Sequence, residues 1–119
     1  MFADTLKRVV DNVDGGLAAV VMGLDGIPVE TYVRQSDRVD VNTVGMEFSF
    51  ILTQVRKATE ILEVGGVSEV TIRCENLTII IRVVSKEYFL ALALKPEGNF
   101  GKGRYLLRVV APKMQSELT

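Results

Sequence analysis

Three neighbouring segments between Val67 and Leu94 are rich in β-branched and aromatic residues. The segments are VSEVTIRC (67–74), LTIIIRVV (77–84) and YFLALAL (88–94). Only two or three residues join them, whereas a parallel crossover needs a dozen or more, so they are predicted to form an antiparallel meander. One face of 67–74 is polar, which suits a sheet edge. Both faces of 88–94 are apolar, which places that strand in the centre, between helices.

Two further strands are predicted upstream. LAAVVMGL (17–24) is apolar throughout, and IPVETYVR (27–34) alternates. Asp25-Gly26 between them is a dipeptide that favours a tight hairpin turn. Pro28 cannot donate to a central ladder, so 27–34 is predicted to be an edge strand. With the two fully apolar strands as central neighbours, the simplest antiparallel order, numbered along the chain, is 2-1-5-4-3.

Three helices complete the pattern. The first covers about 2–13 and is stopped by Asp14-Gly15-Gly16, and the second runs to Val64 from a cap at Asp40, after a polar loop at 35–40. The third follows Asn99, and Pro112 is expected to interrupt it with a kink or a restart near Ala111. The element order α-β-β-α-β-β-β-α predicts an α/β (α+β) fold, in which helices cover both faces of a five-stranded antiparallel sheet, with 1–119 forming a single domain.

The second helix carries two apolar stripes. On a wheel of about 100° per residue, one stripe is predicted to cover the sheet, and its residues are Val44, Phe48, Ile51, Leu52, Val55, Ala58 and Leu62. A second stripe lies nearly opposite and contains Met46, Phe50, Lys57, Ile61 and Val64. A helix on one sheet face has no intramolecular reason for that second stripe. We therefore predict that Met46, Phe50, Lys57 and Ile61 bind a partner; the alternative is cover by the 35–40 loop.

The strand at 67–74 has few features that would block pairing at its open edge. It contains no proline and no lysine, so a second copy of the chain could add to it. The alternative is that a loop or side chains blunt the edge. Paired copies would form a ten-stranded sheet with their long helices side by side. The predicted dimer edge consists of Glu69, Val70, Thr71, Ile72 and Arg73.

Composition argues against several classes of function. Lys and Arg number 14 against 15 Asp and Glu, so the chain has no overall basic field for nucleic acid. It contains no histidine, so Ser-His and Cys-His nucleophilic pairs cannot form, and we expect no catalytic residues. No Cys/His cluster suggests a metal site. The single cysteine, Cys74, excludes an intrachain disulfide and is expected to be a small buried filler.

Three remaining features receive ordinary interpretations. The carboxylate pairs Asp37/Asp40 and Glu60/Glu63 are expected to be solvated. The Gly-rich turn at 98–103 could present amides and Lys102 to an anion, but it lacks phosphate-loop spacing, so a plain loop is favoured. Charges near the N-terminus argue against a signal peptide, and the absence of a long apolar run argues against membrane insertion. We therefore predict a cytoplasmic location.

Several stretches together resemble the roadblock (dynein light-chain) family. These are the LDGIPVE hairpin, the long second helix, YFLALAL and the closing GKGRYLLRVVAPKMQSEL. The resemblance spans essentially the whole chain and implies a roadblock/profilin-like fold without catalytic residues or cofactors. It also implies a homodimer, or a heterodimer with a related domain, formed through the strand edge and the second helix.

The family resemblance further implies a class of partner. Bacterial members commonly accompany a small Ras-like GTPase and modulate its nucleotide cycle, and the partner would contact the paired second helices. Met46, Phe50, Lys57 and Ile61 occupy the matching surface in this chain. The alternative is a structural or scaffold subunit of a larger assembly. A small-molecule sensor with a ligand near 98–103 is less favoured.

Overall fold

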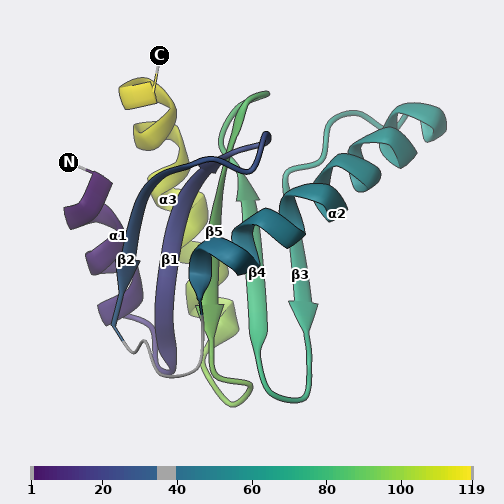
Figure 1. Cartoon of the computed structure of the whole chain (residues 1–119). Helices are drawn as coiled ribbons and strands as arrows, with labels where there is room; N and C mark the ends of the chain where they lie inside the picture. Colours follow the sequence, from purple (N-terminus) through teal and green to yellow (C-terminus); the bar gives the residue numbers. More distant parts are fainter. Residues whose placement is uncertain (1, 35–39, 119) are drawn as a thin grey trace.

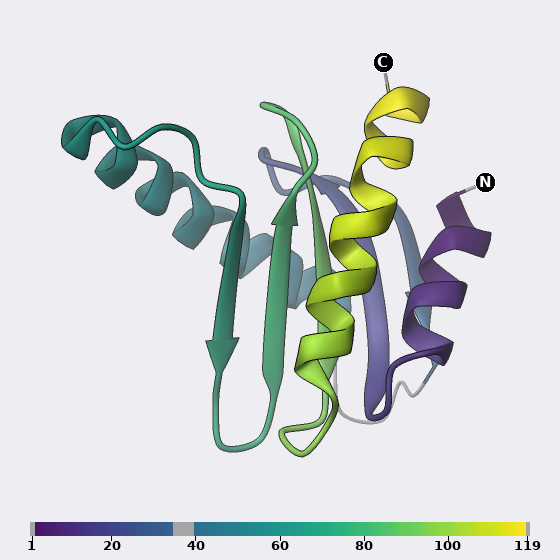
Figure 2. The same cartoon turned by 180° about the vertical axis from the view of Figure 1, so that it is seen from behind.

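The computed structural model describes residues 2–34 and 40–118. The elements follow the predicted order, and the sheet has the predicted strand order β2-β1-β5-β4-β3, antiparallel throughout. The bounds are α1 Phe2–Asp11, β1 Gly16–Gly23, β2 Pro28–Val33, α2 Val41–Leu62, β3 Glu69–Arg73, β4 Thr78–Val83, β5 Tyr88–Leu94 and α3 Phe100–Leu118. Helices α1 and α3 cover one face of the sheet and α2 crosses the other (Figures 1 and 2).

Two hydrophobic clusters lie on the two faces of the sheet. Successive side chains of β5 point to opposite faces, so Leu90, Leu92 and Leu94 join the cluster under α1 and α3. Phe89, Ala91 and Ala93 join the cluster on the α2 side. The face of β5 that carries the small alanines is therefore the face that α2 crosses. All eight residues of β1 are buried, as predicted for a central strand.

Helix α3 does not break at its proline. It runs from Phe100 to Leu118 with Pro112 inside it, so the helix does not restart near Ala111, and the alternative, a kink there, stays a prediction. Proline leaves the carbonyl of Arg108 without its helical donor. Both Arg108 and Pro112 are exposed, so water can satisfy that carbonyl, while Ala111 and Met114 hold the helix against the sheet.

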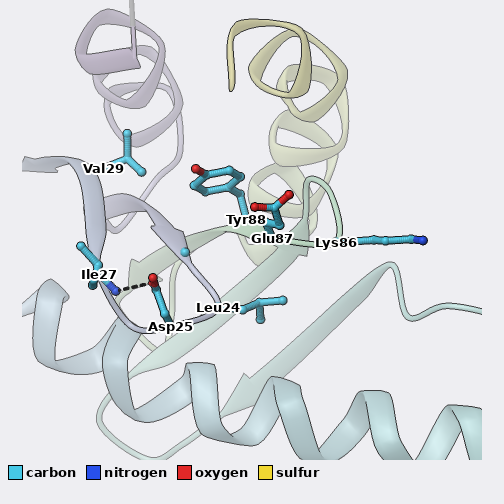
Figure 3. A pocket seen from close by; sticks show the side chains of 8 residues that line it. Leu24, Asp25, Ile27, Val29, Lys86, Glu87 and Tyr88 are labelled. Atoms are coloured by element: carbon cyan, nitrogen blue, oxygen red, sulfur yellow. Dashed lines mark hydrogen bonds between the residues drawn. The ribbon is translucent and has the colours of Figure 1, made fainter. Parts of the chain in front are cut away.

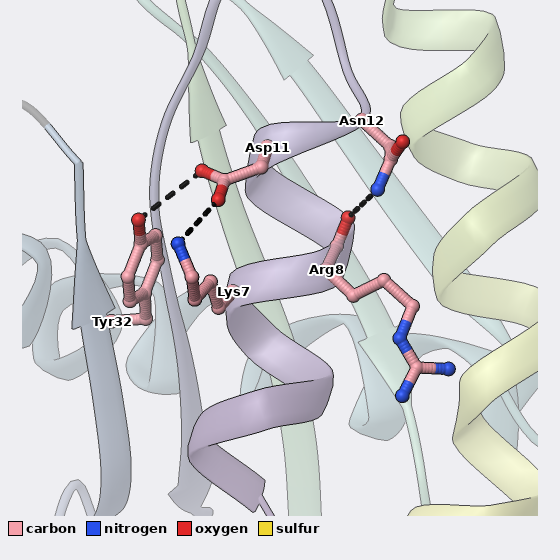
Figure 4. Close-up of polar contacts among 5 residues, drawn as sticks. All are labelled: Lys7, Arg8, Asp11, Asn12 and Tyr32. Carbon is pink, nitrogen blue, oxygen red and sulfur yellow. Dashed lines mark hydrogen bonds and ion pairs between the residues drawn. The ribbon is translucent and has the colours of Figure 1, made fainter.

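A small polar network fastens α1 to the edge strand β2 (Figure 4). The Lys7 ammonium donates to Asp11 Oδ2 at 2.8 Å, and the Tyr32 hydroxyl donates to Asp11 Oδ1 at 3.1 Å. Lys7 Nζ also lies 5.4 Å from the centre of the Tyr32 ring. One carboxylate thus joins a helix to a strand that follows it by about twenty residues.

Candidate protein-interaction surface

The predicted cap at the start of α2 is confirmed. Asp40 Oδ1 accepts from the backbone N–H groups of Asn42 (3.1 Å) and Thr43 (3.3 Å), and Oδ2 accepts from the Thr43 hydroxyl (2.9 Å). The bonds from Thr43, with a smaller contribution from Asn42, lower the pKa of Asp40 below its ordinary value. The first turn of α2 is therefore fixed by its own side chains.

The end of α2 comes two residues before the predicted one. Leu62 is the last helical residue, and Glu63 adopts a left-handed conformation with φ 55°. The Glu63 N–H donates to the carbonyl of Glu60 at 3.2 Å. Gly65 also has a positive φ, 91°, a conformation that favours glycine and that often follows the end of a helix.

Helix α2 packs on the sheet through small residues. A Cβ atom at Gly45 would lie 2.8 Å from Met22 Cε and 3.4 Å from Val20 Cγ1 on β1. Such close approach of helix and strand is possible only without a side chain at this position. The buried residues of the helix are Val41, Gly45, Ser49 and Leu52. Gly45 and Ser49 therefore lie on the sheet-facing side of α2, together with the apolar residues Val41 and Leu52.

The predicted core face of α2 is therefore only partly correct. Leu52 is fully buried, and Val44 and Phe48 pack against the same cluster. Ile51 and Leu62, by contrast, are 40% and 68% exposed. The helix is rotated toward its small residues, and its C-terminal half extends beyond the sheet (Figures 1 and 2). Ala58 is exposed for the same reason. The i, i+4 spacing of Gly45 and Ser49 was the sequence signal for this rotation.

The side chains predicted to bind a partner all lie exposed on α2. Met46, Phe50 and Ile61 are 48%, 63% and 81% exposed, and Lys57 is exposed between them. The alternative cover by the 35–40 loop concerns residues 35–39, which lie outside the described residues. We call the exposed apolar and flanking positions the outer α2 surface: Met46, Phe50, Ile51, Lys57, Ile61, Leu62 and Val64. A patch of this kind on a small domain is typical of a protein-binding surface.

Strand β3 is the outermost strand on its side of the described sheet. Cys74 N–H donates to the carbonyl of Leu77, and Val83 N–H donates to that of Ser68, so even-numbered residues of β3 bond to β4. In an antiparallel ladder the bonding direction alternates with each residue. The backbone groups of Glu69, Thr71 and Arg73 therefore point toward the open edge.

The two faces of β3 differ in chemistry. Val70 packs against the cluster on the α2 side. On the other face, Glu69 Oε2 accepts from Arg104 Nε of α3 at 2.7 Å, and Glu69 Oε1 lies 3.9 Å from Arg82 Nη1 of β4. Arg73 lies over the Phe100 ring at 4.4 Å. The structure thus places the whole predicted edge, Glu69–Arg73, in one strand, with ionic contacts toward α3 that the sequence did not indicate.

Cys74 is exposed, so the prediction of a buried filler is wrong. Strand β3 ends at Arg73, and Cys74 therefore begins the turn to β4. Alternation alone assigned it to the apolar face, but an edge strand has no further strand beside it and the helices do not reach this turn.

The Gly-rich turn at 98–103 is used for packing. A Cβ atom at Gly98 would lie 2.7 Å from the carbonyl oxygen of Asp14, and one at Gly103 would lie 2.9 Å from Leu92 Cδ2. Asn99 caps α3, because its Oδ1 accepts from the Lys102 N–H at 3.0 Å. Gly98, Gly103 and this amide are therefore already engaged. Residues 100–103 belong to α3, so the prediction of a plain loop holds only for the residues that precede the helix.

A shallow pocket of about 380 Å³ lies beside the predicted hairpin turn (Figure 3). It is lined by the turn between β1 and β2 and the turn between β4 and β5, including Ile27, Lys86 and Tyr88. Asp25 is the only acid on the hairpin side, and its Oδ1 accepts from the Ile27 N–H at 3.0 Å. The carboxylate therefore holds the turn.

Within residues 2–34 and 40–118, no group of three or more His, Cys, Asp or Glu side chains could hold a metal ion. Among the helices of this described part, none is both long and apolar enough to cross a bilayer.

The sheet order and the helices on both faces define a roadblock/profilin-like fold. The chain belongs to the Roadblock/LC7 family, because the family model for the Roadblock/LC7 domain matches residues 2–94. Helix α3 lies beyond the matched residues. No curated relative matches the chain.

Solved structures agree with this assignment. MglC from Myxococcus xanthus is 49% identical with 98% of each chain covered and a TM-score of 0.70. A Roadblock/LC7 domain from Streptomyces avermitilis is 15% identical, with 98% of this chain and 96% of that chain covered and a TM-score of 0.86. Myxococcus xanthus MglB is 7% identical, with 98% and 93% covered and a TM-score of 0.83. The last two similarities concern the fold alone.

Proposed function

We propose that this chain is a dimeric, non-enzymatic regulator of a small Ras-like GTPase in the cytoplasm. The paired α2 helices of the dimer would form the surface that binds the GTPase. The observation that carries the proposal is the outer α2 surface, where Phe50 and Ile61 are 63% and 81% exposed on a helix that already covers the sheet through its small residues. Membership of the Roadblock/LC7 family and the likeness to MglC support it.

The size of the apolar surface makes a partner energetically reasonable. Burying one large apolar side chain contributes about 1.5 to 3 kcal/mol relative to leaving it in water. Met46, Phe50 and Ile61 are all on this surface, and Ile51 and Leu62 extend it. The free energy gained by this burial must exceed the cost of association. Two paired copies of α2 would offer more apolar surface for this than one copy.

The open edge of β3 would supply the second half of the dimer contact. Because Glu69, Thr71 and Arg73 direct their backbone groups outward, a two-fold axis at Thr71 would set Glu69 of each copy opposite Arg73 of the other. Opposite charges directly across an antiparallel pair are stabilising. Shifting the axis by one residue toward the C-terminus would instead bring Glu69 opposite Glu75, and like charges disfavour that register.

A chain without histidine is poorly equipped for general acid-base chemistry of its own. We therefore infer that any effect on nucleotide hydrolysis or exchange arises indirectly, by ordering the switch regions of the GTPase. This mechanism predicts a preference for one nucleotide state.

The test is to measure binding of the purified chain to a candidate Ras-like GTPase loaded with a GTP analogue or with GDP. Phe50→Asp should keep the circular dichroism spectrum and weaken dimerisation or GTPase binding by at least about tenfold, since a charge replaces an aromatic side chain that the proposed contact would bury. Val29→Asp is the matched control, because Val29 is also exposed, at 43%, but lies on β2.

Binding of no GTPase in either nucleotide state would contradict the proposal. Equal binding in both states would favour the alternative, a scaffold subunit that holds a larger assembly without regard to nucleotide. Unchanged mass and unchanged binding in Phe50→Asp would show that the outer α2 surface is not the contact.

A further inference from the structure

A group of arginines gathers where α3 approaches the β3 edge, on the face of the sheet opposite α2. We call it the arginine patch, and its members are Arg73, Arg82, Arg104 and Arg108. Arg82 and Arg104 both contact the Glu69 carboxylate. Arg108 lines a pocket of about 220 Å³ together with Glu69 and Arg104. Arg73 stacks on Phe100, the first residue of α3.

The patch is cationic although the protein is not. Glu69 is the one carboxylate that pairs with these arginines among the described residues, so four positive charges meet one negative charge. Setting aside the four arginines and Glu69 leaves ten cations against fourteen acids in the rest of the sequence. Charge is therefore divided unequally over the molecule, and the patch stands out against an acidic background.

The patch also has the side chains that dominate protein interfaces. Tyr105 is 54% exposed and lines the same pocket, and Val109 is 53% exposed on the next turn of α3. The Arg108 guanidinium lies 5.6 Å from the centre of the Tyr105 ring, so the tyrosine helps to hold the arginine in place. Arginine and tyrosine are enriched among the residues that contribute most to binding.

The contact between Arg104 and Glu69 is an example of the chemistry that suits this site. Two nitrogens of the Arg104 guanidinium contact one carboxylate oxygen, Glu69 Oε2, and charge-assisted bonds of this kind are stronger than those between neutral groups. Arg108 faces the same pocket, and in the described part of the chain no carboxylate is paired with it. Its guanidinium is held by an aromatic ring and open to solvent.

We propose that the arginine patch, with Tyr105 and Val109, is a docking surface for an acidic polypeptide segment of a partner protein. A Glu or Asp of that segment would pair with Arg108, and an apolar residue beside it would pack on Tyr105 and Val109. Complementary charge would also steer the segment to this face, because the rest of the surface repels it.

An acidic polypeptide fits this surface better than an anionic membrane. Helices that lie on membranes place large apolar residues such as Trp, Phe and Leu between their basic residues. The exposed large apolar residues of α3 are only Tyr105 and Val109. Glu69 lies within the patch, where it can be satisfied by arginine but would face a dense layer of anionic headgroups unfavourably.

The patch is independent of the outer α2 surface, because the two lie on opposite faces of the sheet (Figures 1 and 2). If two copies pair along β3, their patches would lie on either side of the two-fold axis, on the face away from the paired α2 helices. A dimer could then hold a GTPase on one face and an acidic segment on the other.

The test is fluorescence anisotropy with a labelled peptide of about a dozen residues that alternates glutamate with leucine. A peptide with glutamine in place of glutamate is the uncharged comparison. The wild-type chain should bind the glutamate peptide, with an affinity that falls as salt is added. Arg108→Glu should weaken this binding by at least about tenfold, as expected for loss of a charge-assisted contact, and Arg108→Lys should weaken it less.

Lys86→Glu is the matched control, because it reverses an exposed charge in the turn between β4 and β5. It should leave peptide binding unchanged. Equal binding of the two peptides, equal affinity of wild type and Arg108→Glu, or an equal loss in Lys86→Glu would overturn the proposal. So would binding to phosphatidylserine vesicles without binding to the glutamate peptide.

The same Arg108→Glu sample separates this proposal from the proposed function. Its solution mass and its GTPase binding should equal those of wild type, because Arg108 lies outside both β3 and the outer α2 surface. Loss of peptide binding with retained GTPase binding supports the patch as a separate site. Loss of both together would overturn the claim that it is separate.

Discussion

At the scale of single residues, Asp11 has the clearest electrostatic environment in the described chain. Its pKa lies below the ordinary value, chiefly because Lys7 donates to it, with a further contribution from Tyr32. The pKa of Lys7 is raised, mainly by the same bond. A depressed carboxyl pKa contributes stability that is present above the unfolded pKa and is lost as pH falls through the folded value. The raised pKa of Lys7 contributes until pH rises through its own folded value.

Lys7→Ala should therefore raise the pKa of Asp11 toward its ordinary value, because the largest cause of the depression is removed. Tyr32→Phe should raise it less, since the tyrosine is the smaller contributor. Carboxyl-carbon NMR titration of the folded protein measures both effects directly. An Asp11 pKa that does not move in Lys7→Ala would show that the bond between α1 residues Lys7 and Asp11 does not persist in solution.

At the scale of elements, α2 shows that the buried face of a helix follows shape as well as hydrophobicity. Gly45 and Ser49 let the helix approach β1 closely, so Ile51 and Leu62 are left outside although periodicity assigned them to the core. Close approach of α2 to β1 gains dispersion contacts along the turn that contains Gly45. The exposed apolar residues of α2 remain available to contact another protein. If α2 only covered its own sheet, rotating it so that its exposed apolar residues faced the sheet would be more favourable.

Gly45→Leu should test this close approach. The new side chain would collide with Met22 and Val20, and overpacking of a core of this kind costs about 1 to 3 kcal/mol. Chemical denaturation measures the change. Gly101→Leu is the matched control, because a Cβ there meets only Asn99 Oδ1 at 3.6 Å and leucine is the better helix former. Equal stability of wild type and Gly45→Leu would mean that α2 lies further from β1 in solution than in this structure.

The strand order was predictable because the strands carry strong local signals. Asp25-Gly26 and Glu75-Asn76 fix two hairpins, Pro28 assigns an edge, and the apolar faces of β5 assign the centre. The sequence also identified Met46, Phe50 and Ile61 as outward-facing. The sequence could not reveal the exposure of Cys74 or the ionic contacts of Glu69. Both depend on the position of α3 relative to β3, which lies about thirty residues earlier in the chain.

At the scale of the whole molecule, three surfaces share the β3 side of the sheet. Helix α2 extends past this side on one face (Figure 1). The arginine patch lies on the other face, where α3 contacts β3, and the open edge of β3 lies between the two. A second copy that paired along β3 would thus extend both faces at once. This arrangement lets a single edge contact double the area of two separate binding surfaces.

If the chain forms the proposed dimer, Thr71→Pro should convert it into a monomer with the fold retained. Proline removes an outward N–H of β3 and leaves the bonds to β4 in place, and edge strands tolerate it. Thr31→Pro on β2 is the matched control. The Thr31 N–H also points away from the neighbouring strand, and it donates to the side chain of the preceding residue, Glu30, at 3.3 Å. Light scattering should give the mass of one chain for Thr71→Pro and of two for wild type and Thr31→Pro.

The register of the dimer gives the sharpest test of its geometry. A two-fold axis at Thr71 brings the two copies of that residue directly opposite each other, with Cα atoms about 5.5 Å apart in a hydrogen-bonded pair, within the range of a disulfide. In a Cys74→Ser background, Thr71→Cys should therefore form a covalent dimer under mild oxidation, seen as doubled mass on a non-reducing gel. Glu69→Cys should not, because that residue would lie opposite Arg73. Efficient cross-linking of Glu69→Cys, with none for Thr71→Cys, would move the axis along the strand and remove the proposed pairing of Glu69 with Arg73.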